Sequence, residues 1–128
     1  MRLILDTHTF LWWITDDHRL SSRARHVIGD PSNELFLSAA SAWEIAIKTK
    51  LGRLRLRERA DRFIPDQLSR NSISPLPIEM SHALHTARLP DIHRDPFDRL
   101  IIAQSLLEKA PIVTADRVIR KYKVETIW

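Results

Sequence analysis

The chain has 128 residues and no cysteine, and 44% of its residues are hydrophobic and 28% charged. This balance predicts one globular domain spanning residues 1–128, and it excludes disorder, disulfides and thiolate metal sites. A cysteine-free chain suits a reducing cytoplasm, where we expect it to act. The apolar run from Phe10 to Ile14 is far shorter than the ~20 residues of a membrane span, so we expect no membrane role. The net charge of +4 favours polyanionic partners.

The first half of the chain alternates short apolar segments with helical periodicity. It predicts a strand at Arg2–Leu5, a helix at Thr7–Ile14, a short helix capped by Ser21 or Ser22, a strand at Glu34–Leu37 and a helix at Ala39–Leu51 that ends at Gly52. A charged stretch from Leu54 to Leu68 also has helical spacing, interrupted at Pro65.

The second half continues the alternation. It predicts a poor or edge strand at Ile73–Ile78, helices at Glu79–Arg88, Phe97–Lys109 and Asp116–Tyr122, and strands at Ile112–Thr114 and Val124–Ile127. Strands that alternate with helices indicate an α/β protein whose parallel sheet is covered on both faces. In such sheets the functional site lies beyond the carboxyl ends of the strands.

Four acidic residues fall near this edge of the predicted sheet, and each comes from a separate segment. Asp6 follows the first strand, and Asp116 follows the strand at Ile112–Thr114. Glu44 lies early in the helix after the second strand, and Asp98 lies in the first turn of its own helix. We therefore expect these four carboxylates to lie close together.

Such a cluster needs a counter-charge. Two unit charges ~4 Å apart repel by about 4 kcal/mol at an effective dielectric of ~20, so protons or cations must relieve the repulsion. Oxygen ligands select hard ions, which makes Mg²⁺ or Mn²⁺ the expected partner. These ions activate water and stabilise the charge that develops in phosphodiester cleavage. A basic chain with an acidic pocket thus favours a nuclease.

Each acid also has a purely structural interpretation. Asp6 and Asp116 are suited to cap helices, and Glu44 can pair with Lys48 one helical turn later. Asp98 sits where a helix dipole favours negative charge. Trp43, beside Glu44, is interpreted as a core residue rather than a base-stacking platform.

Four segments of the chain resemble, in order, the motifs of VapC-type PIN-domain toxins. They are LILDTH at residues 3–8 followed by LWW at 11–13, SAWEIAIK at 41–48, DPFDRLIIAQ at 95–104 and TAD at 114–116. The third is the most specific, and together the motifs cover nearly the whole chain.

The resemblance implies a three-layer α/β/α PIN-like fold with a central, mostly parallel sheet, and a Mg²⁺- or Mn²⁺-dependent endoribonuclease. It implies that the catalytic acids are Asp6, Glu44, Asp98 and Asp116, with Asp6 and Asp98 as direct metal ligands. Thr7 and Thr114 match polar positions that support the pocket. Asp95 is a candidate for capping the helix at Phe97 and, second to that, for supporting the pocket as a further acid. The resemblance also implies an RNA substrate, a cognate antitoxin that inhibits the enzyme, and a homodimer.

Five arginines crowd into residues 53–62, and Arg53, Arg55 and Arg57 are candidates for gripping a nucleic-acid backbone. A solvated surface or a protein contact remains open for this stretch. His82 and His85 share a helix face but lack a third zinc ligand, and His93 beside the acidic loop is not assigned a catalytic role.

Three other functions are alternatives to a ribonuclease. A haloacid-dehalogenase-type phosphotransferase needs a second aspartate two residues after the first, where this chain has His8. A non-catalytic module that binds a basic peptide or a structural cation would use the same acids without metal-dependent chemistry. A DNA nuclease would have the same pocket. The sequence does not distinguish it from a ribonuclease, because no residue indicates recognition of a 2′-hydroxyl.

Overall fold

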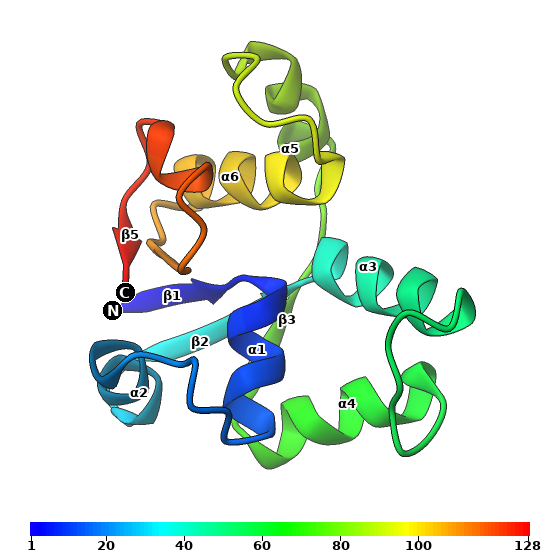
Figure 1. Ribbon diagram of the computed structural model, residues 1–128. Helices are drawn as coiled ribbons and strands as arrows, with labels where there is room; N and C mark the ends of the chain where they lie inside the picture. Colours follow the sequence, from blue (N-terminus) through cyan, green and yellow to red (C-terminus); the bar gives the residue numbers. More distant parts are fainter.

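The computed structural model describes residues 1–128, and at its centre is a five-stranded sheet in the order β3-β2-β1-β4-β5 (Figure 1). The strands are β1 (Arg2–Leu5), β2 (Glu34–Ser38), β3 (Ile73–Leu76), β4 (Ile112–Val113) and β5 (Thr126–Ile127). Every neighbouring pair is parallel, so all five strands end at the same edge of the sheet. The strand that carries Pro75 lies at an edge, as expected.

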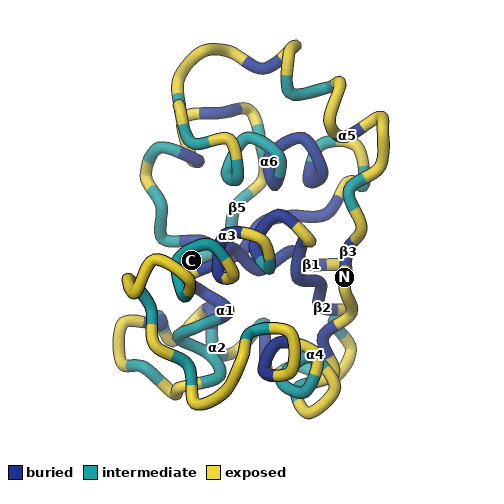
Figure 2. Tube along the Cα trace, turned by 90° about the vertical axis from the view of Figure 1, so that its right-hand side faces the viewer, coloured by how far each residue is buried: buried dark blue, intermediate teal, exposed yellow.

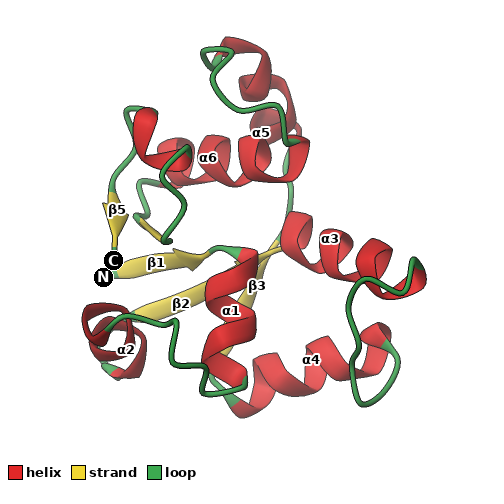
Figure 3. Cartoon of the chain, in the orientation of Figure 1, coloured by secondary structure: helices red, strands yellow, loops and turns green.

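Helices cover both faces of the sheet. They are α1 (Thr7–Ile14), α2 (Ser22–Gly29), α3 (Ala39–Lys50), α4 (Ala60–Arg70), α5 (Met80–His85) and α6 (Pro96–Glu108), with 3₁₀ turns at Thr86–Arg88 and Ile119–Lys121. Helices α1, α2 and α4 lie on one side of the sheet and α5 and α6 on the other, with α3 beyond the carboxyl ends of the strands (Figure 3). This confirms the predicted three-layer α/β/α fold. None of the helices has both the length and the apolar run that crossing a membrane requires.

The core consists of two layers because side chains alternate along the buried strands. Leu3 and Leu5 of β1 pack in a cluster with Phe10 of α1 and Phe63 of α4. Ile4, between them, points to the opposite face and packs with residues of α6. Figure 2 shows these buried segments running through the centre of the molecule. The central strand is therefore fixed from both sides, and with it the point at which the chain leaves the sheet.

Two predicted helices are wrong in extent. The stretch from Leu54 to Arg59 is irregular, and α4 begins only at Ala60. Exposed arginines alternate with half-buried leucines there, a period of two that gives no helical apolar face. Pro65 lies inside α4, where its missing N–H removes one helical hydrogen bond without ending the helix. The predicted helix at Asp116–Tyr122 is only the 3₁₀ turn.

Candidate metal-dependent nuclease site

The predicted acidic residues lie beyond the carboxyl ends of the strands. Asp6 follows β1 directly, and Glu44 is carried by α3, which begins where β2 ends. Asp116 follows β4, and Asp98 projects from the first turn of α6. The name "acidic pocket" is used below for these four side chains.

Asp6 is held by hydrogen bonds to both of its carboxylate oxygens. The Thr9 backbone N–H donates to Oδ1 at 2.7 Å, and the Thr114 hydroxyl donates to Oδ2. The side chain thereby caps α1, which confirms the structural interpretation of this residue. Asp6 is 6% exposed, and this burial raises its pKa above the usual value for an aspartate. Each carboxylate oxygen keeps a further lone pair that can bind a cation.

Thr114 connects Asp6 to Asp116. Its hydroxyl oxygen accepts the Asp116 backbone N–H at 3.0 Å while the hydroxyl donates to Asp6. The Asp116 Oδ1 in turn accepts the Val118 N–H at 2.7 Å. Two acids from opposite ends of the chain are thus joined through one buried threonine.

Glu44 is buried and paired on both oxygens. The Thr7 hydroxyl donates to Oε1 at 2.7 Å, and the Lys48 ammonium lies 2.7 Å from Oε2. The ion pair expected from helical spacing therefore exists, but the carboxylate is only 6% exposed rather than solvated. Thr7 lies where it can orient this carboxylate.

Asp98 lies among several charged side chains of the pocket. Its burial, together with the charge of Asp95, raises its pKa to about 7; His93 opposes this rise, while Glu44 and Asp116 add to it. Asp95 itself caps α6 by accepting the backbone N–H groups of Phe97 at 2.9 Å and of Asp98 at 3.4 Å. The sequence offered both a capping and a supporting role for Asp95, and the structure shows the cap.

His93, which the sequence placed beside the acidic loop without a catalytic role, enters the acidic pocket. Its Nε2 lies 2.8 Å from Asp98 Oδ2 and 3.7 Å from Asp116 Oδ2. The nitrogen is buried and has no aligned hydrogen-bond partner. No periodic signal marks a loop histidine, and only its position two residues before Asp95 pointed to the pocket.

The donor set fits a small divalent cation. One ligand atom from each of His93, Asp98 and Asp116 lies within 4.8 Å of the others. Asp6 is outside this grouping but adjoins it through Thr114. A cluster of carboxylates in which the pKa of Asp98 is raised is the pattern that a bound cation would relieve.

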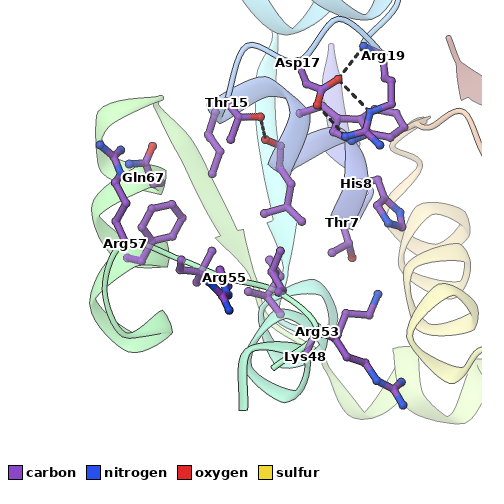
Figure 4. A pocket seen from close by; sticks show the side chains of 17 residues that line it. Thr7, His8, Thr15, Asp17, Arg19, Lys48, Arg53, Arg55, Arg57 and Gln67 are labelled. Atoms are coloured by element: carbon purple, nitrogen blue, oxygen red, sulfur yellow. Dashed lines mark hydrogen bonds and ion pairs between the residues drawn. The ribbon is translucent and has the colours of Figure 1, made fainter. Parts of the chain in front are cut away.

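A groove beside the acidic pocket carries the predicted basic residues (Figure 4). This "basic groove" is a cavity of about 550 Å³ with an apolar floor that includes Leu11 and Phe63, and its cationic lining residues are Arg19, Lys48, Arg53, Arg55 and Arg57. A second cavity of about 310 Å³ is lined by Asp6 and Asp116. The two cavities share His8, Trp12 and Arg19, so the groove adjoins the acidic pocket.

Two other residues were placed by the structure. Trp43 is 57% exposed, and its ring packs edge to face against that of Phe97 with the ring centroids 5.1 Å apart. Its interpretation as a core residue is therefore wrong. Helical spacing alone did not reveal which face of α3 turns outward. His82 is buried, accepts the Glu79 N–H and contacts Glu108, which leaves it a structural histidine.

An α/β/α sandwich with carboxylates gathered beyond a parallel sheet defines a candidate metal-dependent hydrolase. The chain belongs to the PIN domain family, which matches residues 3–125.

The chain is similar to two proteins of Mycobacterium tuberculosis. It is 41% identical to ribonuclease VapC16 over 64 residues, which is 50% of this chain and 45% of that protein. It is 30% identical to ribonuclease VapC22 over 130 residues, and this alignment covers 98% of both chains. The resemblance inferred from the four motifs is thereby confirmed.

Solved structures confirm the fold. VapBC2 from Rickettsia felis, bound to a promoter DNA fragment, contains a chain that matches with a TM-score of 0.69 at 14% identity, over 99% of this chain and 98% of that one. FitAcB from Neisseria gonorrhoeae matches with a TM-score of 0.61 at 18% identity, over 98% and 96% of the two chains.

Proposed function

We propose that this protein is an endoribonuclease that requires Mg²⁺ or Mn²⁺ and acts in the cytoplasm as the toxin of a toxin–antitoxin pair. The observation that carries the proposal is the acidic pocket of a PIN-domain chain, whose carboxylates come from four separate segments. The ribonuclease names of two relatives, one of them aligned over 98% of this chain, support RNA as the substrate.

The residues of the pocket have distinct proposed roles. Asp6 and Asp98 bind the metal directly, and Glu44 and Asp116 complete the negative site around it. When bound, the ion supplies an activated water and stabilises charge on the phosphate. Thr7 and Thr114 orient the carboxylates through their hydroxyls, while Asp95 fixes the start of α6 and adds negative charge beside Asp98.

The basic groove is the proposed path of the RNA backbone. Arg53, Arg55 and Arg57 line it without any ion pair to a carboxylate, so their charge is free to meet phosphates. Arg59, in contrast, pairs with Asp61 at 2.5 Å. A chain entering along the groove reaches the acidic pocket past His8 and Trp12.

Two protein partners are part of the proposal. A cognate antitoxin follows from the toxin family, and its binding would have to close the pocket or the groove. A second copy of this chain is the other partner. Exposed Trp43 on α3, and exposed Met80 and Leu84 on α5, are the apolar side chains that such a dimer would bury.

The first test is cleavage of a mixed single-stranded RNA by the wild type and by Asp98→Asn, with Mg²⁺, with Mn²⁺ and with excess EDTA. We expect cleavage that needs metal and is lost in the variant. Glu125→Gln is the matched control and should retain activity, because Glu125 is an exposed acid just before β5, at the edge of the sheet opposite the pocket. Intact RNA in every wild-type reaction, with the antitoxin shown to be absent, would favour a non-catalytic binding module.

A parallel reaction with single-stranded DNA of the same sequence tests the DNA-nuclease alternative. Preferential cleavage of DNA would replace RNA as the substrate and leave the metal site unchanged. Cleavage that persists in EDTA and in Asp98→Asn would mean that the activity belongs to a contaminant or to another site.

A further inference from the structure

The loop before α6 places a histidine between two acids of the pocket. The His93 Nε2 lies 2.8 Å from Asp98 Oδ2 and 3.7 Å from Asp116 Oδ2, and its side chain is 19% exposed. Asp98 is on α6 and Asp116 follows β4, so a single imidazole contacts carboxylates from two separate segments.

The backbone that carries His93 is anchored from two directions. The Arg99 guanidinium donates to the carbonyl oxygens of Thr86 at 2.7 Å, of Pro90 at 2.9 Å and of His93 at 3.3 Å. The His93 N–H donates to the Tyr122 hydroxyl at 2.7 Å, and Arg99 donates to the same hydroxyl at 3.2 Å. The guanidinium thus ties the whole loop to α6, and the imidazole is a fixed part of the pocket rather than a mobile surface group.

The protonation of the other ring nitrogen, Nδ1, determines whether Nε2 carries a proton. The Asp95 backbone N–H donates to His93 Nδ1 at 3.3 Å, so Nδ1 must be the unprotonated nitrogen. In the neutral ring the proton is then on Nε2, the nitrogen that faces the two carboxylates. A nitrogen that carries a proton has no lone pair for a metal, although its position alone would suit a ligand.

We propose that His93 is a positioning residue of the metal site and not itself a ligand. Its ring lies between Asp98 and Asp116, and its Nε2–H, which is not aligned with either carboxylate in this structure, turns towards Asp98 and holds the two carboxylates in the orientation that binds the cation. This inference rests on the metal dependence in the proposed function. Groups that hold ligating side chains in place typically change metal affinity by about 10–100-fold when they are removed.

The test measures the affinity of the full chain for Mn²⁺ by electron paramagnetic resonance, in the absence of RNA. We expect His93→Ala to raise the Kd for Mn²⁺ by about 10–100-fold, and His93→Gln, whose amide can place an N–H near Nε2, to restore much of the affinity. Thermal unfolding of both variants shows whether they are folded. If His93→Ala does not fold, the comparison of wild type, His93→Gln and His93→Leu carries the same test. An unchanged Kd in the variant without the donor would overturn the proposal.

A spectroscopic readout separates positioning from ligation. Electron spin-echo modulation of bound Mn²⁺ detects a directly coordinated ¹⁴N, and we expect none in the wild type. A nitrogen coupling that disappears in His93→Gln would make His93 a ligand and overturn the positioning role. Wild-type protein that binds no Mn²⁺ would overturn the metal dependence together with this inference, whereas tight binding unaffected by His93 would overturn this inference alone.

Discussion

The acidic pocket and the basic groove hold opposite charges in different ways. In the pocket, Asp6 and Glu44 are buried and each oxygen has a hydrogen-bond or ion-pair partner. In the groove, Arg55 and Arg57 are exposed on an irregular segment without a carboxylate partner. Lys48 belongs to both regions, since it pairs with Glu44 and lines the groove. The pocket is therefore built for fixed geometry, and the groove for attraction at longer range.

The largest expected effect is the loss of RNA cleavage when Asp6 is replaced. Both Asp6→Asn and Asp6→Ala should reduce RNA cleavage by about a thousandfold or more, because metal-assisted stabilisation of several kcal/mol is lost. The two variants should differ in stability. Alanine removes the cap that accepts the Thr9 N–H and should lose about 1 kcal/mol of unfolding free energy, while asparagine keeps an acceptor.

Cleavage rates and urea unfolding of the two Asp6 variants check this pair of expectations. A variant that is inactive only because it is unfolded would show the same defect in both measurements. Wild-type activity in folded Asp6→Asn would remove Asp6 from the catalytic set and leave the pocket to the other three acids.

A smaller effect tests the groove. Reversing Arg55 and Arg57 to glutamate should weaken binding of single-stranded RNA and make the dependence of log Kd on log salt shallower by about one unit for each lost phosphate contact. Binding is measured in Ca²⁺ or in the Asp98→Asn background, which we expect to be inactive. Arg23→Glu, at an exposed residue of α2 that lines neither the groove nor the cavity beside it, is the control. An unchanged slope would reassign the groove to a protein partner.

The sequence predicted the pocket better than the groove for a physical reason. Asp6 and Asp116 follow buried strands, and parallel strands must end at one edge, so local pattern fixed their neighbourhood. The arginines lie on a segment whose leucines pack against the core without helical periodicity, so its predicted helix is wrong. His93 lies in a loop whose position depends on contacts from Arg99, which no local pattern encodes.

Replacing Asp98 by asparagine removes one negative charge from the pocket and should stabilise the protein when no metal is bound. Burial and neighbouring carboxylates raise the pKa of Asp98 to about 7, so the folded state holds a proton that the unfolded state releases above pH ~4. Stability from this group is therefore greatest at low pH and is lost as pH rises towards 7. Asp98→Asn should gain on the order of 1 to 2 kcal/mol over wild type at pH 7.5, and less at pH 5.

Urea unfolding in EDTA at the two pH values measures this gain, with Glu125→Gln as the exposed control. Added Mn²⁺ should stabilise the wild type and reverse the order at pH 7.5, because a ligand that binds only the folded state raises its stability. An equal difference at both pH values would show that Asp98 does not titrate in this range.

The smallest expected effect is a loss of stability at Thr7, which lies where the acidic pocket adjoins the basic groove. Thr7→Val removes the hydroxyl that donates to the buried Glu44, and Lys48 remains as the only other partner of that carboxylate. The unfolding free energy should fall by about 1 kcal/mol, whereas Thr7→Ser, which keeps the hydroxyl, should lose less. Combining each variant with Lys48→Met in a double-mutant cycle measures whether the two partners of Glu44 act together. Additive losses would mean that each fixes Glu44 independently. A loss in Thr7→Ser as large as in Thr7→Val would mean that the Thr7 methyl, which valine keeps, contributes as much as the hydroxyl. No loss in Thr7→Val would mean that the hydroxyl does not hold Glu44, and the carboxylate would then owe its orientation to Lys48, the residue that joins the pocket to the groove.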